Sequence, residues 1–129
     1  MLAREKRSAI VVTSSGLGIR PVAGIAAYSA SKAYASSFAQ ALSYETEGKI
    51  DVVDWACGEV STKLMPAAHR HNPRAISTEA AVKGLLRSIG HDRVTSGARK
   101  HETANWMFSS APLGPVNRMM YSVMSKSYR

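Results

Sequence analysis

AIVVTSSGLGIRPVAGIAAYSASK, residues 9–32, is the stretch of this 129-residue chain that decides its fold. Residues 9–13 form a short β-branched run bounded by charge on one side and by Ser-Ser-Gly on the other, which is typical of a buried strand in a parallel sheet. Glycines and a proline then indicate a loop over residues 16–24. An Ala-rich and Ser-rich segment without Gly or Pro predicts a long helix over residues 28–47.

The residues that follow extend this stretch into a strand–helix–strand unit. Gly48 stands where a C-terminal cap is expected, and Ile50–Ala56 (IDVVDWA) is typical of a second strand. Such a unit joins two parallel strands by a crossover, and ligands bind at the carboxyl ends of the strands. We therefore predict an α/β fold with a parallel sheet, in one domain over residues 1–129.

Beyond the second strand, a loop, a helix and a short strand are predicted. Residues 58–73 have a loop-like composition with two prolines. Ser77 or Thr78 is then expected to cap a second helix, over Thr78–Gly90. Val94–His101 is compatible with a short strand in an otherwise polar stretch.

The tail over residues 106–121 is apolar but broken by Pro112 and Pro115. Covering the chain's own core is the commoner role of such a segment. The alternative is contact with a membrane surface or with another protein, and the methionines of the tail would form part of that surface.

Composition and charge limit the classes of function. The chain is 45% hydrophobic and 20% charged, as in a folded protein. Its net charge of +8 comes from scattered Lys and Arg, not interleaved with aromatic residues, which favours an anionic ligand or surface and argues against nucleic-acid binding. The single cysteine, Cys57, excludes an intrachain disulfide. The sequence contains no run of about 18 apolar residues, so no membrane-spanning helix is predicted.

The four histidines do not predict a metal site. His69 and His71 have no Asp or Glu near them in the sequence, and His91 and His101 are isolated. Metal sites in proteins usually gather three or four such ligands, so we expect surface histidines and no bound metal.

The glycines after the first strand raise the question of a phosphate-binding loop. A dinucleotide fingerprint needs G-x-G-x-x-G between a strand and a helix, where the backbone approaches the pyrophosphate closely. Here Pro21 takes the place of the third glycine after Gly16 and Gly18, and about ten residues separate Gly18 from the helix. This spacing argues against phosphate binding by the loop.

Tyr28 and Lys32 are stronger candidates for chemistry. They stand four residues apart on the predicted helix, so their side chains share one face. A neighbouring ammonium favours the phenolate form of a tyrosine, which would make Tyr28 a usable acid or base near neutral pH. Ser15, thirteen residues before Tyr28, would bring a hydroxyl to the same point and hydrogen-bond a substrate carbonyl.

Ser15, Tyr28 and Lys32, within Ser-Ser-Gly and Tyr-Ser-Ala-Ser-Lys, resemble the Ser, Tyr and Lys set of the short-chain dehydrogenase/reductase family. The resemblance implies a Rossmann-like, doubly wound parallel sheet and an oxidoreductase that uses NADPH or NADH on a carbonyl or alcohol. It also implies roles: Tyr28 protonates the forming alkoxide and Ser15 orients the carbonyl. Lys32 favours the phenolate and binds the nicotinamide ribose hydroxyls.

The resemblance extends to IDVVDWACGEVSTKL, residues 50–64. By this resemblance Val60 and Thr62 fall on nicotinamide-contacting positions, and Cys57 replaces the usual proline of the turn. Within the family, the chain is most similar to the group of 3-ketoacyl-CoA reductases and 17β-hydroxysteroid dehydrogenase type 12. That similarity implies a 3-ketoacyl-CoA or steroid-like substrate and the endoplasmic reticulum, with the mitochondrion or cytoplasm as alternatives.

The matching part of the family's fold is its C-terminal, catalytic half. We expect the chain to lack the N-terminal nucleotide-binding strands, so that a second polypeptide, or the N-terminal half of a longer protein, completes the sheet. Without it, the edge of the strand at residues 9–13 would lie open and the isolated chain would be inactive. The alternative is a non-catalytic structural subunit of reductase ancestry in a larger assembly.

Overall fold

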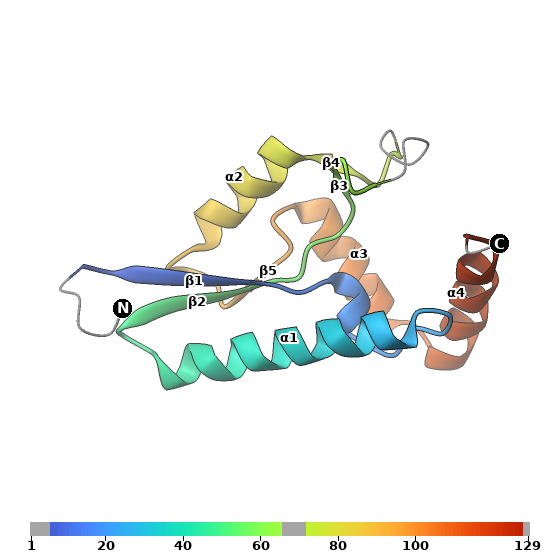
Figure 1. The fold of residues 1–129 in the computed structure, drawn as a ribbon, viewed down its shortest axis with the longest axis horizontal. Coiled ribbons are helices and arrows are strands. Elements are labelled where there is room, and N and C mark those ends of the chain that lie inside the picture. Colours follow the sequence, from blue (N-terminus) through green and yellow to red (C-terminus); the bar gives the residue numbers. More distant parts are fainter. Residues whose placement is uncertain (1–5, 66–71, 128–129) are drawn as a thin grey trace.

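The computed structural model describes residues 6–65 and 72–127 of the chain. Within these ranges, helices lie on both faces of a parallel sheet, so the predicted α/β class is confirmed (Figure 1). Pro66, His69 and His71, which belong to the predicted loop, lie outside the described residues.

The predicted strand–helix–strand unit is present. It consists of β1 (Ser8–Thr13), α1 (Ala26–Glu45) and β2 (Ile50–Trp55). β1 and β2 pair in parallel over all six residues of each strand, from Ser8 opposite Ile50 to Thr13 opposite Trp55. The helix ends before the predicted cap: Gly48 lies in the connecting turn, where its φ of +78° suits a glycine.

α1 covers one face of this sheet (Figure 1). Burial alternates along β1, so every second side chain points toward α1. The core on this side is formed by apolar residues of β1, β2 and α1: Ile10, Val12, Ala39, Leu42, Ile50 and Val52. Burial of these side chains is the main favourable contribution to holding the unit together.

α2 (Thr78–Ser88) lies on the opposite face of the sheet (Figure 1). Of the two predicted caps, Ser77 is the one that caps the helix, because its hydroxyl accepts a hydrogen bond from the N–H of Ala80 at 3.1 Å. Ala81 and Leu85 are the buried apolar residues of α2. The helix ends at Ser88, two residues before the predicted end.

The strand predicted over Val94–His101 is shorter than expected. β5 contains only Val94–Thr95, which pairs in parallel with β2 and gives the order β1-β2-β5. The expectation for the remaining residues was wrong because Gly97, with a φ of +74°, ends the extended backbone. Arg99 then begins a helix, α3 (Arg99–Ser110).

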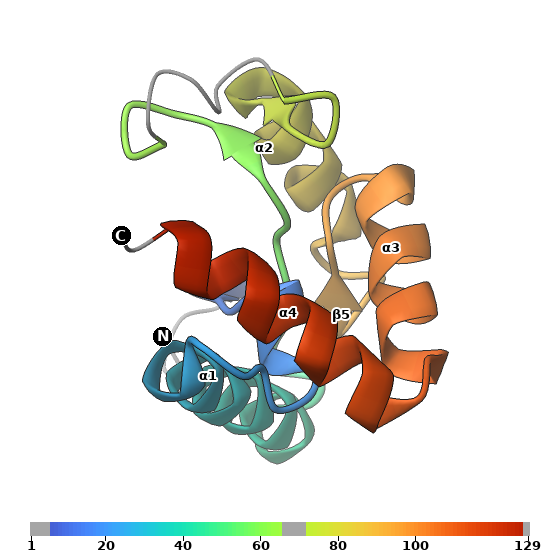
Figure 2. The ribbon, with the colours of Figure 1, turned by 90° about the vertical axis from the view of Figure 1, so that its right-hand side faces the viewer.

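The apolar tail is helical, contrary to its irregular appearance in the sequence. It spans the C-terminal part of α3 from Trp106 and the larger part of α4 (Leu113–Ser127). Pro112 lies between the two helices, and Pro115 lies in the first turn of α4, where a missing N–H breaks no helical hydrogen bond. Figure 2 shows α4 crossing in front of the carboxyl ends of the strands. Asn117 of α4 accepts a hydrogen bond from the N–H of Ala23 at 2.9 Å.

β1 lies at the edge of the main sheet. In the described part of the chain it pairs with β2 alone, so its outer edge is open, as the sequence led us to expect. Val11, which points away from α1, is 38% exposed. No helix within residues 6–65 and 72–127 is both long and apolar enough to cross a bilayer.

Candidate active site

Ser15 lies just beyond the end of β1, between the ends of two strands. The N–H of Ser14 donates to the carbonyl of Trp55 at 3.0 Å, and that of Gly16 donates to the carbonyl of Cys57 at 3.3 Å. Ser15 itself is buried and caps the short helix η1 (Gly16–Gly18), with its hydroxyl oxygen accepting the N–H of Leu17 at 3.2 Å. The hydroxyl hydrogen of Ser15 is therefore free of this bond and can be donated to a ligand.

Tyr28 and Lys32 lie in the first two turns of α1, at the same end of the sheet. The Lys32 ammonium donates to the carbonyl of Thr13, the last residue of β1, at 3.0 Å. Its Nζ is also 5.8 Å from the centre of the Tyr28 ring, a cation–π distance. Lys32 therefore links Tyr28 to the strand end that leads into Ser15, while Tyr28 is 45% exposed and open to a substrate.

Val60 lies on a separate small sheet, and Thr62 directly follows the strand that carries Val60. β3 (Val60–Ser61) pairs in parallel with β4 (Ile76–Ser77), and Thr62 follows β3 in a turn in which its carbonyl accepts the N–H of Met65 at 3.2 Å. Figure 1 shows β3 and β4 on the α2 side of the main sheet, whereas Tyr28 and Lys32 come from α1 on the other side. The proposed nicotinamide contacts and the proposed acid thus lie on opposite sides of the main sheet.

Cys57 occupies the turn between β2 and β3. Its N–H donates to the carbonyl of Trp55 at 2.8 Å, a hydrogen bond that a proline at this position could not make. Burial raises the pKa of the Cys57 thiol, and the nearby positive charge of Lys32 lowers it by a smaller amount. The thiol therefore stays neutral at physiological pH, which fits a small, inert residue in the turn.

A buried polar network beside Ser15 was not anticipated from the sequence. Asp54 of β2 is fully buried, and its carboxylate accepts hydrogen bonds from the hydroxyls of Ser14 and Ser36, the latter at 2.5 Å. The amide of Gln40 donates to the same carboxylate at 3.3 Å. This network ties α1 and β2 to the residue that precedes Ser15. The visible signal was a carboxylate in the middle of an apolar strand.

Histidine and carboxylate side chains do not gather into a metal site here. Within the described ranges there is no group of three or more His, Cys, Asp or Glu residues suited to hold an ion. His101, one of the two described histidines, is buried rather than on the surface as predicted.

Comparison with known proteins identifies the family. The family model for short chain dehydrogenases matches residues 1–73, and the chain belongs to this family. It is also similar to a very-long-chain 3-oxoacyl-CoA reductase of Anas platyrhynchos, with 27% identity over 125 residues, which cover 93% of the chain. The chain spans 38% of the length of that relative. No solved structure gives a significant match.

Family membership fixes the general chemistry to be considered. Short-chain dehydrogenases are oxidoreductases that use NAD(P)(H). The parallel β1-β2-β5 sheet, with helices on both faces, is consistent with part of their Rossmann-like fold. The predicted family and fold class are therefore confirmed.

Proposed function

We propose that the chain is the catalytic part of an NADPH- or NADH-dependent reductase that interconverts a carbonyl and an alcohol. The observation that carries the proposal is the position of Lys32, whose ammonium contacts both the carbonyl of Thr13 and the ring of Tyr28. This contact joins an acid–base pair to the strand end that bears Ser15. The similarity to a 3-oxoacyl-CoA reductase supports a 3-ketoacyl-CoA substrate, with a steroid-like ketone as the alternative.

The residues present fit a nicotinamide nucleotide. A lysine ammonium has three N–H donors, and one of them is used by the carbonyl of Thr13, so two are left for the ribose hydroxyls in the described part of the chain. Val60 in β3 and Thr62 just after it are half-buried and would contact the nicotinamide. The bound nucleotide would supply the hydride that reaches the carbonyl carbon.

Tyr28, Ser15 and Lys32 then have distinct tasks in the reduction. The Tyr28 hydroxyl gives its proton to the carbonyl oxygen as negative charge develops there. Ser15 donates a hydrogen bond to the same oxygen and so orients the carbonyl. Lys32 stabilises the phenolate that Tyr28 becomes, and a solvent proton later restores the phenol. In the direction of alcohol oxidation, the same groups act in reverse.

The test is NADPH and NADH consumption with 3-ketoacyl-CoA and steroid ketones, using tagged protein isolated with whatever accompanies it in its own cells. Tyr28→Phe removes the acid and should lower turnover by about 10² to 10⁴. Tyr34→Phe is the matched control, because Tyr34 lies on the same helix and is 74% exposed. Equal turnover by wild type and Tyr28→Phe would contradict the proposal.

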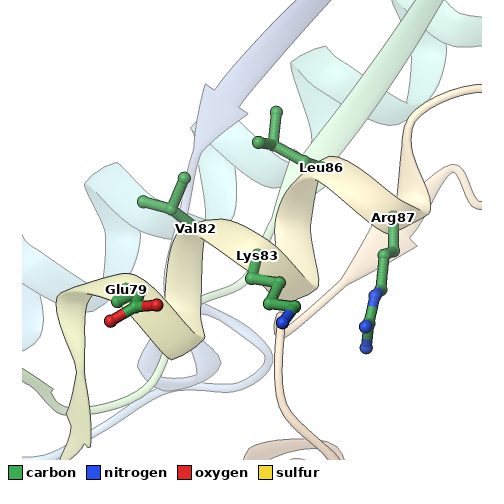
Figure 3. A pocket seen from close by; sticks show the side chains of 5 residues that line it. All are labelled: Glu79, Val82, Lys83, Leu86 and Arg87. Carbon is green, nitrogen blue, oxygen red and sulfur yellow. The ribbon is translucent and has the colours of Figure 1, made fainter.

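We further propose that a second polypeptide, or another part of a longer protein, covers the open side of the sheet. The open edge of β1 could pair with a strand, and exposed Val11 lies beside it. Val82 and Leu86 of α2 are 46% and 61% exposed and line a surface hollow of 440 Å³. Figure 3 shows these two side chains pointing to one side of α2, with Lys83 and Arg87 directed elsewhere.

The open sheet is also what favours a second candidate function, that of a structural subunit in a larger assembly. Exposed Met119 and Tyr121 of α4 would add a contact with another protein or with a membrane surface. Size-exclusion chromatography with mass measurement tests the need for a partner. A stable, folded monomer of 13.9 kDa would contradict it.

A further inference from the structure

We propose that His101 and Asn105 of α3 are positioning residues, which hold the turns at the ends of β1 and β2 in the arrangement that the site needs. They stand four residues apart and therefore share one face of the helix. Each lies against a glycine of one turn, Gly58 or Gly16. The inference rests on the proposed function of that site, since these turns carry Ser15 and lead to Val60.

His101 fixes the turn after β2. His101 is 6% exposed and its ring lies directly on Gly58, so that a β-carbon on Gly58 would come within 2.7 Å of the ring Cγ. Its Nε2 is 3.1 Å from the carbonyl of Arg74, which only accepts, so Nε2 carries the hydrogen. One side chain thus contacts both the segment that enters β3 and the segment that enters β4. These are the two segments that place Val60 and Thr62.

The other ring nitrogen of His101 supports this interpretation. Nδ1 is buried and has no hydrogen-bond partner among the described residues. Buried polar atoms are nearly always paired, so an unpaired one calls for an explanation. The flat ring that fits against Gly58, combined with a donor for the carbonyl of Arg74, gives a reason for a histidine in a site that would otherwise suit an apolar residue.

Asn105 fixes the turn after β1 to the end of β2. Its amide donates to the carbonyl of Ala56 at 3.3 Å and to the hydroxyl of Ser96 at 2.9 Å. Its oxygen lies on Gly16, where an added β-carbon would come within 2.0 Å of it. Gly16 follows Ser15 directly, so a shift of Asn105 would move the backbone that carries the Ser15 hydroxyl.

α3 can keep the two turns at a fixed distance from each other because both of its ends are held in place. Before its first turn, the carbonyl of Gly97 lies so close to Gly84 of α2 that a β-carbon on Gly84 would be 1.7 Å from it. At its C-terminal end, the Arg20 guanidinium donates to the carbonyl of Phe108 at 2.5 Å and to that of Ala111, just past the helix, at 2.6 Å. A helix fixed in this way acts as a rigid spacer between the two turns.

The experiment is a double-mutant cycle in the full chain with His101→Ala and Gly58→Ala. Its readouts are the thermal midpoint, the backbone amide NMR shifts of Ser15, Val60 and Thr62, and the dissociation constant for NADPH and NADH. Gly58→Ala alone should push the turn off the His101 ring, shift the Val60 and Thr62 amides, and weaken nucleotide binding about tenfold. In the His101→Ala background, the same change should have at most a small additional effect.

Additive effects of the two changes, or unchanged amide shifts of Val60 and Thr62 in a folded Gly58→Ala variant, would overturn the proposal. If His101→Ala does not fold, His101→Gln takes its place, because its amide can still donate to the carbonyl of Arg74 while the ring is gone. Wild-type protein that binds neither nucleotide even when isolated with its accompanying partner would contradict the proposed function, and the amide shifts would still decide whether His101 positions the turn.

Discussion

The β1–α1–β2 unit and the α3–α4 region differ in where their contacts go. The first unit contacts mainly itself: β1 pairs with β2 along its whole length, and Asp54 bonds to side chains of α1. The second makes key contacts with the ends of the first, through Asn105 to Ala56 and Asn117 to Ala23. We infer that the first unit carries the reactive groups and that the second sets their spacing.

Removing the carboxylate of Asp54 should have the largest effect, because the first unit depends on its internal network. Asp54→Ala leaves the buried hydroxyl of Ser14 without its acceptor and should lower the free energy of unfolding by about 3 kcal/mol. Asp54→Asn keeps an acceptor and should cost less. Urea denaturation measures both.

Asp51→Ala in the same strand is the matched control for the loss of a carboxylate. It breaks an ion pair with Arg7, whose side chain is 81% exposed, and should cost less than about 1 kcal/mol. Equal losses for Asp51→Ala and Asp54→Ala would mean that the buried network does not hold the unit together.

Lys32→Met tests whether Lys32 acts in the reaction and not only in holding the fold. It removes the ammonium that contacts Tyr28 and Thr13 and should lower turnover about a hundredfold while the thermal midpoint changes little. Lys49→Met, at the opposite end of the sheet, is the control and should keep full activity. A Lys32→Met enzyme as active as wild type would remove Lys32 from the proposed mechanism.

Substitutions on the two faces of β1 should have smaller effects on stability, and they test whether a partner covers the open side of the sheet. Val12 packs under α1, so Val12→Ala should cost about 1 to 2 kcal/mol in unfolding free energy. Val11→Lys on the other face should change the stability of the isolated chain by less than about 0.5 kcal/mol. It should nevertheless weaken association with a covering partner, as measured by sedimentation; unchanged association would argue against a partner at this face.

Alkylation of Cys57 tests how close Lys32 comes to the turn after β2. Because burial raises the pKa of the thiol, less thiolate is present at pH 8 than in an unfolded chain, and iodoacetamide should react more slowly with the folded protein. The rate should rise as the pH is raised above 8. Lys32→Met removes a charge that lowers the pKa, so its Cys57 should react more slowly still; a faster reaction would contradict the geometry.

Local sequence was enough to predict the first unit and its candidate residues. The β-branched run at residues 9–13 and the Gly-free, Pro-free segment after residue 28 each specify one kind of backbone. Tyr28 and Lys32 could be paired because four residues on one helix fix their relation. Their link to the carbonyl of Thr13 required only that the helix return over its own strand.

The remaining features depend on contacts between distant residues. Asp54 was visible as a carboxylate in an apolar strand, but its partner Ser14 stands 40 residues away. His101 looked like an isolated surface histidine because nothing near it in the sequence reveals Gly58. In the tail, Pro112 and Pro115 hid two helices, since prolines at a helix boundary and in a first turn look the same in a sequence as prolines that break a helix.

The most direct test of the central claim is transfer of deuterium from NADPH labelled at C4, on each face in turn, to a 3-ketoacyl-CoA. The protein is the wild-type chain with its accompanying partner, compared with Tyr28→Phe and Tyr34→Phe. We predict deuterium at C3 of the 3-hydroxyacyl product with wild type and Tyr34→Phe, and its loss with Tyr28→Phe. Absence of label with wild type, or equal labelling with Tyr28→Phe, would contradict the claim that Tyr28 is the acid of a carbonyl reductase.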